Sequence, residues 1–173
     1  GFSQVQGASL DFLGEKGYLI GGSKVGGEER SPWLQMDQIV LPGAEWKPSV
    51  VNTGGLLNRA YHATAAIQAS KKLYVFGGEI AEDSDRPYPA EVIEVETKSL
   101  FGLKASIYAP AGDSGAVAVK GLTAAVVGKS VNEHVAIFGG KNSEGGCSDE
   151  LSLFTPLSAE QLTIFSRAPV VFL

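Results

Sequence analysis

The residues best suited to acid–base chemistry stand in one short stretch, Arg59-Ala-Tyr-His62. An imidazole close to a guanidinium and a phenol could accept or donate a proton in a reaction. The other histidine, His134, directly precedes an apolar run, which favours a position at the start of a strand. On residue types alone, His62 fits either a proton-transfer role or a structural one.

Other catalytic and metal-binding patterns are missing from the sequence. Two histidines and Cys147 provide neither a Cys-x-x-Cys nor a His-x-x-x-His spacing. Segment 79–85 has four carboxylates in seven residues, but it lacks the residue order of a calcium loop, so we interpret it as a solvated loop. Gly112-Asp-Ser-Gly115 is interpreted as a turn, and Gly22-Ser-Lys-Val-Gly-Gly27 lacks the Gly-Lys-Ser/Thr of a phosphate loop. We therefore expect no metal and no cofactor.

Composition narrows the class of protein. The 173 residues include 22 glycines, 44% hydrophobic and 19% charged residues, which excludes a disordered chain. The net charge of −5 and the lack of a long basic run argue against nucleic acid as the main partner. No apolar run approaches the roughly 20 residues of a membrane-spanning helix. A single cysteine fits a reducing compartment, and we expect a cytoplasmic protein that is part of a longer one.

A repeat supplies the elements that would position these residues. Three apolar runs end in a glycine pair: residues 17–22, 73–78 and 135–140. A run of small and apolar residues precedes each pair, and an alternating run follows it after a polar loop. A fourth run closes each unit at 46–51, 101–107 and 161–165, although residues 158–162 could instead start a short helix in the third unit. Alternation with a period near two predicts half-buried strands, so each unit predicts a four-stranded antiparallel sheet.

These units resemble the kelch repeat. The family pattern is an apolar strand ending in Gly-Gly, a variable loop, an alternating strand and often a Trp, which Tyr74-Val-Phe-Gly-Gly78 and Phe138-Gly-Gly140 match well. Ile20-Gly-Gly22 followed by Trp46 matches the first copy. Arg59-Ala-Tyr-His62 resembles the Arg-x-Gly-His that often opens a unit, with tyrosine in place of glycine. The later repeats lack the outer Trp, and all three exceed the usual length of roughly 50 residues.

The resemblance implies an all-β fold of kelch-type β-propeller blades, formed by three four-stranded antiparallel sheets. One array would fill residues 1–173, with repeats at about 5–56, 57–115 and 116–173. A plain β-sandwich is the alternative fold. The resemblance also implies structural roles for Gly21, Gly22, Gly77, Gly78, Gly139, Gly140, Arg59, His62 and Trp46, with His62 supporting the inner strand.

The loops after the glycine pairs vary most in sequence, and in the kelch family such loops often recognise partners. The residue types enriched in binding hot spots occur there as Arg30, Trp33, Arg86 and Tyr88. Both aromatic residues adjoin a proline, so packing of each loop onto its own blade explains them equally well. The four residues are our candidate partner-binding site.

Two functions from different classes follow from this reading. We expect a non-catalytic protein-interaction or scaffolding module that binds an unidentified protein partner through these loops. The alternative is a propeller enzyme of a sugar-epimerising or cyclising type, with its site at the central channel. Closed propellers have 4 to 8 blades, so three blades indicate half of a six-bladed ring, which a homodimer could complete.

Overall fold

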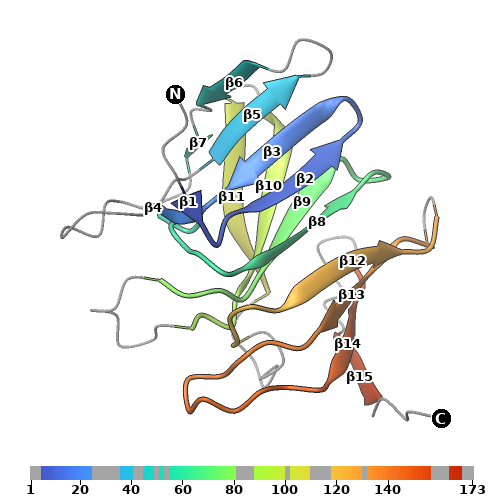
Figure 1. Cartoon of the computed structure of the whole chain (residues 1–173). Helices are drawn as coiled ribbons and strands as arrows, with labels where there is room; N and C mark the ends of the chain where they lie inside the picture. Colours follow the sequence, from blue (N-terminus) through green and yellow to red (C-terminus); the bar gives the residue numbers. More distant parts are fainter. Residues whose placement is uncertain are drawn as a thin grey trace.

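The structure, a computed structural model, describes residues 5–24, 36–40, 45–48, 51–52, 55–80, 88–99, 102–109, 118–129, 132–156 and 164–168. Within these ranges the chain forms fifteen strands and no α-helix. Twelve of the strands form three antiparallel four-stranded units that are arranged as neighbouring blades of a partial β-propeller (Figure 1). This confirms the expected fold class.

Each blade is an antiparallel meander in which consecutive strands are neighbours. Blade 1 consists of β2 (Ser9–Leu13), β3 (Lys16–Ile20), β5 (Met36–Val40) and β6 (Glu45–Pro48). Blade 2 consists of β8 (Ala63–Ile67), β9 (Lys72–Phe76), β10 (Val92–Ser99) and β11 (Gly102–Ala109). Blade 3 consists of β12 (Thr123–Val127), β13 (His134–Phe138), β14 (Leu151–Phe154) and β15 (Ile164–Ala168).

Three short strands lie outside this plan. β1 (Val5–Gln6) pairs with β4 (Ser23–Lys24). β7 (Val51–Asn52) pairs in parallel with β11, at the outer edge of blade 2. The expected fourth run at 46–51 is therefore divided: β6 ends at Pro48, and Val51 belongs to β7, which pairs with the next blade. Proline has no N–H to donate to a ladder, which is consistent with a strand that ends there.

The inner strands meet at the centre of the array. β8 contacts both β2 and β12, so blade 2 lies between the other two blades, which occupy opposite ends (Figure 1). All five residues of β8, Ala-Thr-Ala-Ala-Ile, are buried. Small side chains are needed where neighbouring sheets converge, because larger ones would force the strands apart.

The two faces of blade 2 form two separate cores, as the alternation of side chains along a strand requires. Tyr74 and Phe76 on β9 pack toward blade 3, and their rings contact Phe154 at centroid distances of 5.2 and 5.3 Å. Leu73 and Val75 on the same strand pack toward blade 1. Full burial of one such side chain stabilises the fold by about 1.5–3 kcal/mol, so both faces hold the array together.

Polar contacts join the hairpins of adjacent blades. The Gln68 side chain donates to the Phe12 carbonyl at 2.8 Å and accepts from the Gly14 N–H at 3.1 Å. The Glu133 carboxylate accepts from the Ala69 N–H at 3.1 Å. Blade 2 thus holds the hairpin of blade 1, and blade 3 holds the hairpin of blade 2.

Candidate functional site

Three equivalent main-chain positions open the repeats and are linked to one another. The Tyr61 N–H donates to the Gly7 carbonyl, and the Gly121 N–H donates to the Tyr61 carbonyl, both at 2.7 Å. All three residues have positive φ: 68° at Gly7, 55° at Tyr61 and 70° at Gly121. Glycine adopts this conformation without penalty, whereas a tyrosine is strained by it. Tyr61 therefore stands, under strain, where its equivalents are glycine.

The glycine pairs form the next set of links between repeats. The Gly22 N–H donates to the Arg59 carbonyl at 2.9 Å, and the Gly78 N–H donates to the Val119 carbonyl at 2.8 Å. A Cβ on Gly21 would lie 2.2 Å from the same Arg59 oxygen, so only glycine fits against the next repeat. The six paired glycines all have positive φ: Gly21, Gly22, Gly77, Gly78, Gly139 and Gly140.

Arg59 is buried next to these links, and its side chain donates hydrogen bonds to main-chain carbonyls. Its Nη1 donates to the Gly77 carbonyl at 2.9 Å, and its Nε donates to the Leu56 carbonyl at 3.0 Å. Burial lowers the pKa of Arg59 to about 10, and the charge of Glu91 partly offsets that shift. The guanidinium is still protonated at neutral pH, so it donates hydrogen bonds and is no proton acceptor.

His62 is buried at the joint between blades 1 and 2. Its Nε2 is 2.7 Å from the Ser9 Oγ on β2. Burial, and then the positive charge of Arg59, lower the pKa of His62 to about 3, while main-chain groups of Arg59 and Ile20 partly offset the shift. The imidazole is therefore neutral at physiological pH. This placement fits a link between blades better than an acid–base role.

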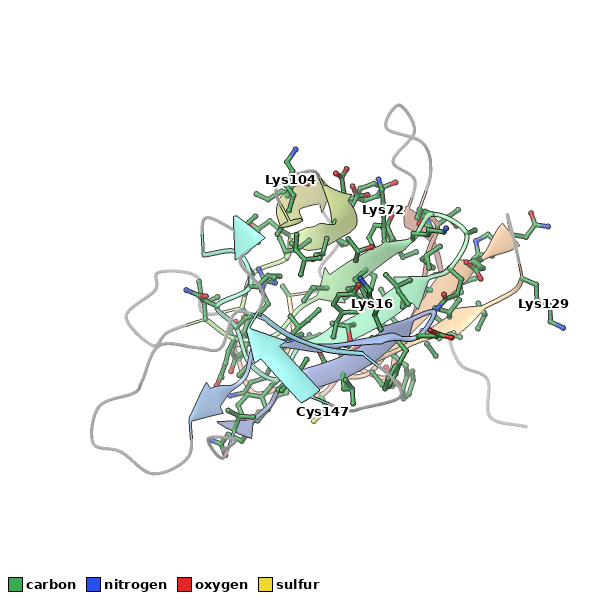
Figure 2. The ribbon with its side chains drawn as sticks, turned by 90° about the horizontal axis from the view of Figure 1, so that it is seen from above. Lys16, Lys72, Lys104, Lys129 and Cys147 are labelled. Carbon is green, nitrogen blue, oxygen red and sulfur yellow. The ribbon has the colours of Figure 1, made fainter. Side chains whose placement is uncertain are left out.

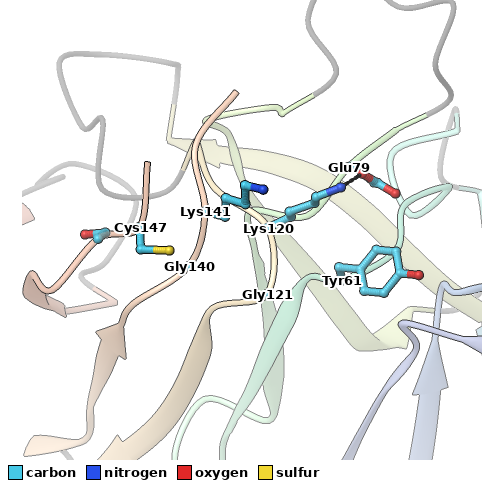
Figure 3. Close-up of a pocket in the computed structure, with 8 residues that line it drawn as sticks. Tyr61, Glu79, Lys120, Gly121, Gly140, Lys141 and Cys147 are labelled. Carbon is cyan, nitrogen blue, oxygen red and sulfur yellow. Dashed lines mark hydrogen bonds and ion pairs between the residues drawn. The ribbon is translucent and has the colours of Figure 1, made fainter. Parts of the chain in front are cut away.

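A pocket of about 510 Å³ opens beside the segments that follow the second and third glycine pairs (Figure 3). Two main-chain bridges build it, because each opening segment pairs with a residue that follows a glycine pair. Ala60 pairs with Glu79, and Lys120 pairs with Lys141, through two hydrogen bonds each. The lining residues are Tyr61, Glu79, Lys120, Gly121, Gly140, Lys141, Cys147 and Ser148.

Lys120 is the central charged group of this pocket. Its ammonium lies 2.5 Å from the Glu79 carboxylate, and a dashed line marks this contact in Figure 3. The same nitrogen lies 5.7 Å from the ring centroid of Tyr61 and 5.4 Å from that of Tyr88. The hydrogen bond to Glu79 is the main reason that the pKa of Lys120 is raised. A cation between two aromatic rings and a carboxylate is attracted by all three groups, which fixes its position in the pocket.

Of the four residues predicted to bind a partner, the structure describes Tyr88 alone. Tyr88 lies beside Lys120 and is half-buried. Arg30, Trp33 and Arg86 lie outside the described residues. Trp46 belongs to β6, of which the structure describes the main chain.

Sequence reasoning missed Lys120, Glu79 and Lys141 as one group. Glu79 was assigned to a solvated acidic loop, but its carboxylate pairs with Lys120. Alignment of Val119-Lys-Gly-Leu122 with Arg59-Ala-Tyr-His62 would have placed Lys120 beside the opening glycine. The sequence alone therefore places Lys120 at the opening of repeat 3. It does not show that Lys120 contacts Glu79, which follows the glycine pair of repeat 2.

Within the described ranges, no three His, Cys, Asp or Glu side chains gather into a group that could hold a metal ion. No helix in the described part of the chain has the length and apolar character needed to span a membrane.

Comparison with known proteins finds a structural likeness. No family model matches the chain, and no curated protein matches it. The solved structure "Structure of YjhT" aligns with 95% of this chain at a TM-score of 0.66 and 18% sequence identity. The aligned part is 52% of that structure, so this chain spans about half its length. At this identity the likeness shows the fold alone.

Proposed function

We propose that this chain is a kelch-type protein-interaction module that binds a partner through the pocket around Lys120. The observation that carries the proposal is the origin of the pocket: its walls come from the openings of repeats 2 and 3 and from the segments after two glycine pairs. Loops held on a rigid scaffold are where binding residues concentrate. The glycine pairs and the Arg59 contacts supply that scaffold.

The chemistry of the pocket favours a peptide with an acidic side chain beside an apolar one. Tyr61 and Tyr88 offer ring surface, and tyrosine is enriched at hot spots of binding energy. Lys141 is exposed and forms no ion pair within the described residues, so its ammonium can bind a carboxylate. Charge-assisted hydrogen bonds of this kind are about twice as strong as neutral ones. Arg30, Trp33 and Arg86 lie outside the described residues and stay sequence-based candidates for partner binding.

The enzyme alternative receives less support from the inner strands. Four of the five residues of β8 are apolar, and all five are buried. The Ser9–His62 pair next to them ties two blades together. Polar groups do occur on the described inner strands, but Asp11 and Ser9 on β2 are engaged by Thr64 and His62 of the next repeat.

The test is a peptide array of about 15-residue sequences in which acidic, neutral and basic versions of the same apolar core are matched. We expect the chain to prefer the acidic versions. Tyr61→Gly removes the ring but gives the main chain the residue that its equivalents, Gly7 and Gly121, already have. Lys141→Ala removes the exposed charge. Each variant should bind the selected peptide about tenfold more weakly, which corresponds to about 1.4 kcal/mol.

Lys104→Ala and Lys129→Ala are the matched controls. Both lysines are exposed and project away from the body of the molecule, so these variants remove the same charge elsewhere (Figure 2). They should bind like the unmodified chain. Equal weakening by the control variants would mean that net charge alone drives binding, and no preference for acidic peptides would reject the proposed ligand.

A further inference from the structure

Blades 2 and 3 can be compared position by position, because their strand pairings correspond. Ala63 pairs with Phe76 in blade 2, and Thr123 pairs with Phe138 in blade 3; a glycine pair follows each phenylalanine. Residues on the face of blade 2 that packs against blade 3 therefore have defined equivalents on the far face of blade 3. We call that far face the end face of blade 3; its apolar members are Ala125, Val127, Ala136, Phe138, Leu151 and Leu153.

Both faces are apolar, but a neighbouring blade covers only the face of blade 2. Phe76 is fully buried against blade 3, whereas its equivalent Phe138 is 40% exposed. Ile67 is buried in the same core, whereas its equivalent Val127 is 40% exposed. Leu153 is also exposed. Blade 3 thus repeats, on its outer side, the surface with which blade 2 receives a neighbouring blade.

Blade 1 has the complementary free surface. Leu10 and Phe12 on β2 are 49% and 41% exposed and lie on the side that faces away from blade 2. By the same pairing, Phe12 corresponds to Ala66, which is buried in the core between blades 1 and 2. We call Leu10, Phe12 and the half-buried Leu19 the end face of blade 1. The two end faces lie at opposite ends of the array (Figure 1).

We propose that a second copy of this chain covers both end faces. Blade 1 of each copy packs on the end face of blade 3 of the other, and the contact repeats the geometry with which blade 3 packs on blade 2 within one chain. Two identical contacts then close a ring of twice three blades. In the solved structure that aligns with 95% of this chain, the aligned part is 52% of the length, so a body of this fold can be about twice as long as this chain. Rotational symmetry that closes leaves no end face free, whereas an open contact would propagate into filaments.

The mass of the 173-residue chain in solution tests this assembly. Sedimentation or light scattering at micromolar concentration should give about twice 18.1 kDa. Phe138→Asp and Leu10→Asp each place a charge in the proposed contact, one on either end face. Each variant alone should sediment as a monomer. Circular dichroism of both variants should retain the β-type spectrum, which shows that they fold.

Ile107→Asp is the matched control, because Ile107 is 52% exposed on β11 of the central blade, away from both end faces. This variant should keep the doubled mass. A monomeric unmodified chain would overturn the proposal. So would a Leu10→Asp variant that stays dimeric while Phe138→Asp dissociates, because that result means blade 3 packs on blade 3. Mass that keeps rising with concentration would replace the closed ring with an open chain.

Discussion

His62 joins blade 1 to blade 2 in its neutral form, since burial and the neighbouring Arg59 oppose its protonation. The pKa is about 3 in the folded protein, against an ordinary value of 6.5. Between these two values the unfolded chain binds the proton and the folded chain does not. Stability from this residue is therefore complete above pH 6.5 and is lost as the pH falls toward 3.

We predict that the free energy of unfolding falls by about 2 kcal/mol between pH 6.5 and pH 5 because of His62, at about 1.4 kcal/mol per unit. Urea unfolding of the unmodified chain and of His62→Gln at the two pH values measures it. The variant is less stable at pH 6.5, because it loses the contact with Ser9, but it should lose much less on acidification. Parallel losses in the two proteins would mean that other groups carry the pH dependence.

The main-chain conformation of Tyr61 could not be predicted from the residue type. The positive φ of the glycine pairs follows from their place at strand ends, and the structure has it at Gly77 and Gly78. The same conformation at Tyr61 is not signalled by the residue itself, since tyrosine strongly prefers negative φ. The motif indicates that Tyr61 takes the place of a glycine, but its positive φ and its hydrogen bonds to Gly7 and Gly121 are known only from the structure.

At the scale of the elements, alternation of apolar and polar residues predicts most strands, but it does not always predict which strands pair. The runs around Tyr74 and Ile93 predict β9 and β10, which pair as expected. β7 is two residues long and pairs in parallel with β11, so neither length nor periodicity marks it. The pocket has the same origin, because Glu79 and Lys120 are far apart in sequence and meet only through the packing of blade 2 against blade 3.

The glycine pairs give the element-scale prediction, with Gly121 as the internal reference. Gly78 and Gly121 both have positive φ, but a Cβ on Gly78 would lie 2.8 Å from the Ala60 carbonyl oxygen, whereas one on Gly121 would meet nothing within 4 Å. Gly121→Ala should therefore cost about 1–2 kcal/mol, the penalty of the left-handed backbone. Gly78→Ala should cost at least about 1 kcal/mol more, because main chain must also move.

Chemical unfolding of the two variants beside the unmodified chain measures this difference. Equal losses would mean that the link between repeats yields easily to an added methyl group. A Gly78→Ala variant as stable as the unmodified chain would show that close approach of the repeats does not hold the blades together.

At the scale of the whole molecule, the exposed apolar residues of the two end faces favour association. Cores on both sides of blade 2 bury Phe76 and Val75 fully, whereas Phe138 and Leu10 at the two ends are 40% and 49% exposed. Exposed apolar side chains that share one face of a sheet are typical of interaction sites. The sequence indicated the two uncovered faces by the count of repeats, but the residues that form them became known only from the strand registers.

Assembly through these faces links stability to concentration, because the folded dimer is favoured by mass action over unfolded chains. We predict that the Tm of the unmodified chain rises by about 2 °C for each tenfold increase in concentration, given the unfolding entropy of a body of twice 173 residues. Calorimetry at ~2 and ~200 μM measures a rise of about 4 °C. Ile107→Asp should show the same rise, whereas Phe138→Asp should melt at one temperature throughout. An unmodified chain whose Tm is the same at both concentrations would show that its end faces stay uncovered, or are covered within a single chain, and that the array folds as a monomer.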